Sequence, residues 1–188
     1  MKDLSARPRL LPERPFPAYA YLPGRQAHPV RDPGGHSYRA EAAQDVDEGA
    51  HDKSDLLYWG MDLFNHGYYW EAHEAWEELW LEADNGSALR RAYKGLILLA
   101  AAGVKIREGK LAAAQRHARR AATHLRAAAE DPNPFLSVAL GRRFDRLSDE
   151  VERISESIPV VPTSNDPEPV FPFVLGPTGN RPVAGQED

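Results

Sequence analysis

Residues 64–80 decide the fold, and they read Phe-Asn-His-Gly-Tyr-Tyr-Trp-Glu-Ala-His-Glu-Ala-Trp-Glu-Glu-Leu-Trp. Asn65 and Gly67 are residues that end helices, so one helix is predicted to stop there and a second to follow. With a helical turn of about 100° per residue, one side of the second helix is aromatic and the opposite side is acidic. The aromatic side carries Tyr69, His73, Trp76 and Trp80, and the acidic side, predicted to be solvated, carries Glu71, Glu74, Glu78 and Glu82.

Glu77 departs from this division. It lies one turn after His73 and about 40° from it around the helix, on the aromatic side. An imidazole and a carboxylate are therefore predicted to point together into a Trp-rich interior, where an unpaired polar group costs roughly 2 kcal/mol or more. The pair marks a candidate site.

The composition limits the class of protein. The chain has 188 residues, no cysteine and a net charge of −5, so disulfides and thiolate metal sites are excluded and general nucleic-acid affinity is not expected. No apolar run approaches the roughly 18 residues of a membrane span, and the amino terminus shows no apolar leader. These features predict a prokaryotic, cytoplasmic protein without a membrane segment.

Proline divides the chain into three parts. Residues 1–53 and 159–188 are rich in proline or glycine and are predicted to form extended arms around a helical domain at 54–158. Aromatic and aliphatic residues within the arms are expected to anchor them on the helices. They are Phe16, Tyr19, Tyr21, Leu22, Val170, Phe171, Phe173, Val174 and Leu175.

Apolar periodicity predicts an all-α fold of about five helices, arranged as an antiparallel bundle of helical hairpins. The expected helices cover residues 54–65, 68–83, 87–107, 110–129 and 135–157, and a short acidic helix at 39–49 is weakly indicated. The third is apolar on nearly every side between Gly95 and Val104, so it should lie at the centre. Gly60, Gly67, Tyr69, Ala72 and Trp76 resemble a tetratricopeptide hairpin, although two hairpins are fewer than such an array needs.

Three interpretations of His73 and Glu77 remain open. The pair is purely structural if each side chain satisfies the other or a neighbour, as buried polar groups usually do. Alternatively, the two side chains bind a divalent metal such as Zn, Mn or Fe, for which nitrogen and oxygen ligands are suited. Further metal ligands would then come from His117, His66, His28 or His36, with Tyr69, Trp76 and Trp80 around the pocket.

The third interpretation is a binding module, in which a groove between hairpins holds a peptide or a small ligand. If the protein is instead an enzyme, metal-assisted hydrolysis is the expected chemistry, with Glu74 or Glu77 as the base. The arginines Arg116, Arg119, Arg120, Arg142, Arg143 and Arg146 are interpreted as a solvent face, because no aromatic residues accompany them as in a nucleic-acid surface. Substrate and oligomeric state are left open by the sequence.

The segment around His73 resembles the prokaryotic family called domain of unknown function 309. The family signature of His, three residues, Glu, two residues and Trp or Tyr corresponds to His73, Glu77 and Trp80. The resemblance covers roughly residues 54–129, and the proline-rich front with His28 and His36 resembles an extension of longer members. It implies a small all-helical protein without an established activity, and a signature suggested to bind metal. These implications extend to His73, Glu77 and Trp80 and to no other residue.

Overall fold

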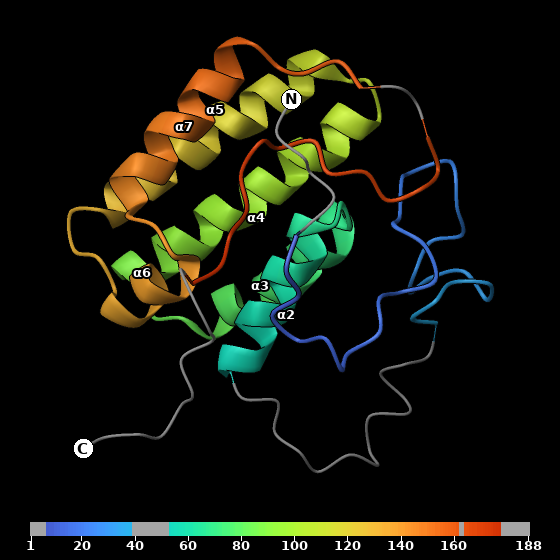
Figure 1. Cartoon of the computed structure of the whole chain (residues 1–188), viewed down its shortest axis with the longest axis horizontal. Coiled ribbons are helices and arrows are strands. Elements are labelled where there is room, and N and C mark those ends of the chain that lie inside the picture. Colours follow the sequence, from blue (N-terminus) through green and yellow to red (C-terminus); the bar gives the residue numbers. More distant parts are fainter. Residues whose placement is uncertain (1–6, 39–52, 162–163, 178–188) are drawn as a thin grey trace.

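The computed structural model describes residues 7–38, 53–161 and 164–177, and within these ranges it contains six helices and no strand (Figure 1). The helices are α2 (Lys53–Asn65), α3 (Tyr69–Glu82), α4 (Ala88–Arg107), α5 (Leu111–Ala128), α6 (Pro134–Leu140) and α7 (Phe144–Glu156). The predicted all-α class is confirmed. The acidic helix suggested for residues 39–49 lies outside the described residues.

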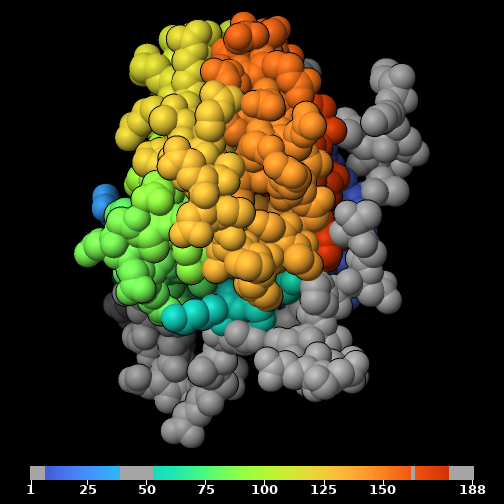
Figure 2. All heavy atoms as spheres, turned by 90° about the vertical axis from the view of Figure 1, so that its left-hand side faces the viewer, coloured from blue at the N-terminus to red at the C-terminus, as the bar shows by residue number. Residues whose placement is uncertain are grey.

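The helices pack in the order of the chain. α2 lies on α3, α3 on α4, α4 on α5, and α5 on α7. The connections are short, as is typical of antiparallel helical hairpins. Figure 1 places α4 in the middle of the molecule, and Figure 2 shows α5 and α7 (yellow and orange) side by side as one outer face. The central position of α4 follows from its composition, since Leu96, Leu99 and Ala100 are fully buried.

Side-chain caps fix the starts of two helices, α4 and α6. Ser87 precedes α4, and its hydroxyl accepts a hydrogen bond from the Arg90 N–H at 3.0 Å. Asn133 caps α6 in the same way through Leu136 N–H at 2.9 Å. The first four predicted helices are therefore observed to within one residue at each end.

The single helix predicted for 135–157 is wrong, because α6 and α7 are separate. Gly141 ends α6 with a φ of +65°, a left-handed conformation that favours glycine. A chain segment distant in sequence fixes this break: Gly176 N–H donates to the Leu140 carbonyl at 3.1 Å. A Cβ on Gly141 would lie 1.8 Å from the Gly176 oxygen, so only glycine fits there.

Close helix crossings depend on small residues opposite aromatic rings. Gly60 of α2 meets the Trp76 ring of α3, and a Cβ at Gly60 would lie 2.2 Å from Trp76 Nε1. Gly103 of α4 meets the Tyr69 ring in the same manner, at 2.6 Å. These contacts hold α3 tightly between α2 and α4.

Both arms pack on the helices through apolar residues. Leu11, Ala20, Tyr21 and Leu22 of the N-terminal arm are buried, as are Val170, Phe171, Phe173 and Leu175 of the C-terminal arm. The Phe64 ring of α2 stacks on Phe171 at 5.1 Å between centroids. Burial confirms the expected anchoring for six of the predicted residues, whereas Leu11 and Ala20 are further anchors that the sequence analysis did not name: the six are Tyr21, Leu22, Val170, Phe171, Phe173 and Leu175.

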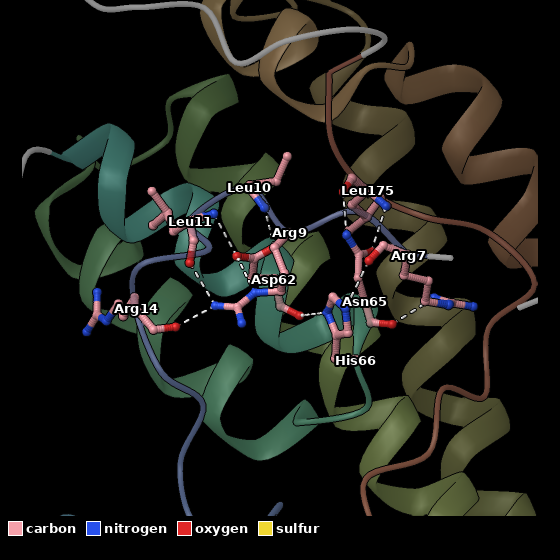
Figure 3. Close-up of polar contacts among 9 residues, drawn as sticks. All are labelled: Arg7, Arg9, Leu10, Leu11, Arg14, Asp62, Asn65, His66 and Leu175. Carbon is pink, nitrogen blue, oxygen red and sulfur yellow. Dashed lines mark hydrogen bonds and ion pairs between the residues drawn. The ribbon is translucent and has the colours of Figure 1, made fainter. Parts of the chain in front are cut away.

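Polar side chains of α2 also hold the arms (Figure 3). Asp62 is fully buried and accepts from Leu10 N–H at 2.7 Å, from Leu11 N–H at 2.8 Å and from Arg9 Nε at 3.0 Å. Asn65 donates to the Leu175 carbonyl at 2.6 Å and accepts from the Leu175 N–H at 2.8 Å. One turn of α2 thus satisfies the backbone of both arms.

Arg7 connects the two arms. Its guanidinium donates to the carbonyls of Asn65 at 2.9 Å, Phe171 at 2.8 Å and Phe173 at 3.2 Å.

No helix of the described residues is both long enough and apolar enough to cross a membrane.

Candidate functional site

Helix α3 positions the candidate site, and its buried face fixes the rotation of the helix. Ala72 and Trp76 are fully buried, and Leu79 is nearly so. The helix starts after Gly67, whose φ of +87° reverses the chain from α2. This rotation leaves His73 and Glu77 at the edge of the buried face, half-buried rather than enclosed.

His73, Glu74 and Glu77 form a cluster of possible metal ligands. Each offers one ligand atom, and the three atoms lie within 4.8 Å of one another. The His73 side chain is 25 % exposed and that of Glu74 48 % exposed, so an ion from solvent can reach the cluster. Glu74 belongs to the face predicted to be solvated, and it is exposed, yet its carboxylate approaches the imidazole.

The His73 imidazole has an unsatisfied nitrogen. Its Nδ1 is buried and has no hydrogen-bond partner among the described residues. The Glu74 Oε1 is 3.4 Å away, which is an ion-pair distance but not a hydrogen bond of acceptable geometry. The ring plane lies nearly parallel to Trp70, with centroids 6.1 Å apart. The structural interpretation expected each side chain to bond the other or a neighbour; the two side chains do not bond each other, and His73 Nδ1 has no hydrogen bond to a described neighbour.

His117 of α5 adds a second imidazole near this cluster. Burial lowers the pKa of His117, and the charges of Arg120, Lys105, Arg116 and His73 lower it further. The imidazole is therefore neutral at pH 7 and keeps a lone pair for a ligand. Its Nδ1 is buried and unpartnered in the described structure, as is that of His73.

The other predicted histidines have different surroundings. His66 Nδ1 lies 2.8 Å from the Asp62 carbonyl, and its Nε2 lies 3.2 Å from the Arg7 carbonyl. His28 accepts from the Val30 N–H at 3.3 Å, and its ring contacts Trp70. His36 contacts Glu71. The structure does not bring His66, His28 or His36 into the His73 cluster.

The three aromatic residues predicted around the pocket lie in separate environments. Tyr69 is buried, and its hydroxyl accepts from Val170 N–H at 2.7 Å; burial raises the pKa of Tyr69 to about 12. Trp76 is enclosed and donates to the Leu57 carbonyl at 3.4 Å. Trp80 is half-buried beneath the Arg90 guanidinium at 4.1 Å and the Lys94 ammonium at 4.5 Å.

The prediction that Glu71 is solvated is wrong, because the N-terminal arm covers it. Glu71 is only 8 % exposed, and its Oε1 accepts from the Tyr21 N–H at 2.9 Å and lies 3.2 Å from His36 Nε2. The position of Glu71 around the helix axis cannot show that the N-terminal arm packs over it. Asp62 was also not anticipated, although its place inside the apolar run from Leu57 to Phe64 was a usable signal.

A described cleft lies near α3, but His73 is not among the residues that line it. It has a volume of about 780 Å³ and lies between the N-terminal arm, α2 and the Glu71–Glu74–Glu78 side of α3. The binding-module interpretation expected a groove between hairpins beside His73, whereas this cleft lies on the acidic side of α3, under the N-terminal arm.

Comparison with known proteins gives one match. No curated protein and no solved structure matches the chain. The matching family carries only the description of a domain of unknown function, so it supplies no activity. Residues 57–117 match the model of that family, domain of unknown function (DUF309), which confirms for the segment from α2 into α5 the resemblance predicted from the sequence.

Proposed function

We propose that the protein binds a divalent metal ion at His73, Glu74 and Glu77. The observation that supports this proposal is the approach of their three ligand atoms to within 4.8 Å, with the Nδ1 of His73 lacking a hydrogen bond to any described residue. A buried nitrogen without a hydrogen bond costs roughly 1–3 kcal/mol, and coordination would remove that cost.

The donor set fits particular metals. One imidazole nitrogen and two carboxylate oxygens are ligands suited to Zn, Mn or Fe, and the absence of cysteine excludes thiolate sites. All three side chains come from one rigid helix, so the site needs no rearrangement of the backbone. We infer that His117 is a candidate for a fourth ligand, because it is neutral and close enough to His73 for the two to interact electrostatically.

The first experiment measures metal content and affinity. Protein stripped with a chelator and titrated with Zn²⁺ or Mn²⁺ in a calorimeter should bind about one equivalent. His73→Ala and Glu77→Gln should each weaken binding by at least roughly tenfold, since each removes a ligand. His124→Ala is the matched control, because His124 lies on the same helix as His117 but outside the cluster.

Two results would contradict the proposal. Metal-replete protein that holds less than roughly a tenth of an equivalent has no specific site. Equal affinity in His73→Ala and His124→Ala would show that the bound ion lies elsewhere.

Metal-assisted hydrolysis remains a prediction that depends on this site. A bound divalent ion would supply an activated water at neutral pH. If Glu74 and Glu77 both serve as ligands, neither is free to act as a base; His117 would be the group available to hold a proton only if it does not itself bind the ion. Loss of hydrolysis in His117→Gln with metal content unchanged would assign that role.

A further inference from the structure

The cleft beside the N-terminal arm has features of a binding site that the metal cluster does not explain. Its walls come from three parts of the chain: α2 contributes Trp59 and Leu63, the arm contributes Phe16, and α3 contributes Glu71, Glu74 and Glu78. The cleft of about 780 Å³ is large enough for a small organic molecule.

Glu71 at the floor of the cleft keeps one oxygen free. Its Oε1 contacts both Tyr21 N–H and His36, whereas its Oε2 is buried and has no partner among the described residues. Its side chain is only 7 % exposed, so this oxygen is withdrawn from bulk solvent. A buried carboxylate oxygen without a donor favours a ligand that brings a donor, above all a charged one.

The charge and shape of the cleft identify the donor as a cation. Glu71, Glu74 and Glu78 line it together with two basic residues, Arg14 and His36. The Arg14 guanidinium already lies over the Trp59 ring at 4.4 Å and is close enough to Glu78 to interact with it electrostatically. This contact shows that the Glu78 end accommodates a cation next to an aromatic surface. At the Glu71 end, His36 Nε2 lies 3.2 Å from Glu71 Oε1 and the Arg107 charge interacts with Glu71, but Oε2 has no hydrogen-bond partner among the described residues.

We propose that this cleft binds a small aliphatic diamine. One ammonium group donates to Glu71 Oε2, the methylene chain lies along the apolar wall from α2 and Phe16, and the second ammonium group faces Glu74. Glu71 and Glu74 are three residues apart on one helix face, a rise of about 4.5 Å, which a short methylene spacer can bridge. This site shares one residue, Glu74, with the proposed metal centre and otherwise uses different side chains.

The test titrates putrescine into metal-free protein kept in chelator, with heat of binding as the readout. Saturable binding is expected, and Glu71→Gln should weaken it by at least about tenfold because the charge-assisted bond is lost. The glutamine retains the Oε1 acceptor for Tyr21 N–H, so the arm should remain docked. Glu156→Gln on exposed α7 removes the same charge outside the cleft and should leave binding unchanged.

Comparison ligands test the chemistry of the site. Butylamine should bind more weakly than putrescine, and uncharged butanediol should not bind. Equal weakening by Glu71→Gln and Glu156→Gln would reduce the effect to general attraction by an acidic protein and would overturn the proposal, as would absence of saturable binding.

Two further variants keep the test decisive. If thermal melting shows that Glu71→Gln is unfolded, Glu74→Gln should lower the preference for putrescine over butylamine, and an unchanged preference would overturn the proposal. His73→Ala should lose metal but keep putrescine binding, so the two proposals can fail separately.

Discussion

Asp62 illustrates how much one side chain organises in this protein. Its fully buried carboxylate binds two consecutive backbone N–H groups of the N-terminal arm and the Arg9 side chain. Arg9 in turn lies over the Phe16 ring at 3.9 Å. The start of the arm is therefore attached to α2 by charge-assisted hydrogen bonds rather than by apolar contact alone.

Replacing Asp62 should destabilise the whole domain. Asp62→Ala removes the acceptor of two backbone N–H groups and of Arg9 Nε, while Arg9 Nη2 keeps the carbonyls of Leu11 and Arg14; the expected cost is roughly 3 kcal/mol in the free energy of unfolding. Urea denaturation measures this loss. The control is Asp131→Ala, an exposed carboxylate after α5, which should change stability by less than about 0.5 kcal/mol. Similar values for the two variants would contradict the assigned role of Asp62.

Among single residues, the sequence predicted the proximity of His73 and Glu77 better than it predicted the environment of Glu71. The phase of one helix suffices to place His73 beside Glu77, because both lie on the same element. The environment of Glu71 depends on Tyr21 and His36, which are 50 and 35 residues away. Helical periodicity contains no information about such partners.

Among the helices, Gly67 lies where α2, α3 and the C-terminal arm meet. Its φ of +87° disfavours other residues, and a Cβ there would lie 2.5 Å from the backbone nitrogen of Glu168. Gly109 has a similar φ of +71° at the α4–α5 turn, with open space around it. Gly67 and Gly109 share a left-handed backbone, but only Gly67 lies against the C-terminal arm. Comparing substitutions at the two positions therefore distinguishes the cost of the backbone conformation from the cost of a clash with the arm.

Alanine at these two positions should therefore have unequal effects. Gly109→Ala should cost about 1–2 kcal/mol, the price of the left-handed conformation alone. Gly67→Ala should cost more and should also speed hydrogen exchange at Val170, whose N–H binds Tyr69. Equal losses of stability and unchanged exchange would show that the arm does not constrain Gly67.

Helix bounds were predictable wherever their causes are local. Ser87 and the glycine turns at 67 and 109 sit next to the helices that they limit. The break between α6 and α7 instead depends on Gly176, which contacts Leu140 from the far end of the described chain. The apolar pattern of residues 135–157 continues through Gly141, so periodicity alone favours one helix.

The molecule as a whole should lose stability in mild acid. Burial lowers the pKa of both His117 and His124 below the ordinary 6.5, and Arg120 lowers both further. The folded state therefore binds fewer protons than the unfolded chain, so stability is complete above about pH 6.5 and falls as the pH drops through the lowered values.

Urea midpoints measured at a series of pH values below neutrality test this dependence. The double variant His117→Gln, His124→Gln should show a flatter profile, because neither position then gains a proton on unfolding. An identical slope in the variant and the original protein would assign the acid sensitivity to other groups.

The stacking of Phe64 on Phe171, with Tyr69 against the same ring, has a consequence for where this protein can be cut. The family match ends at residue 117, whereas Phe171 belongs to the C-terminal arm. A fragment truncated to residues 57–117 would lack Phe171 and would expose Phe64 and Tyr69 as a hydrophobic patch that promotes self-association. The stretch of chain that buries these aromatic rings is therefore longer than the segment that matches the family model.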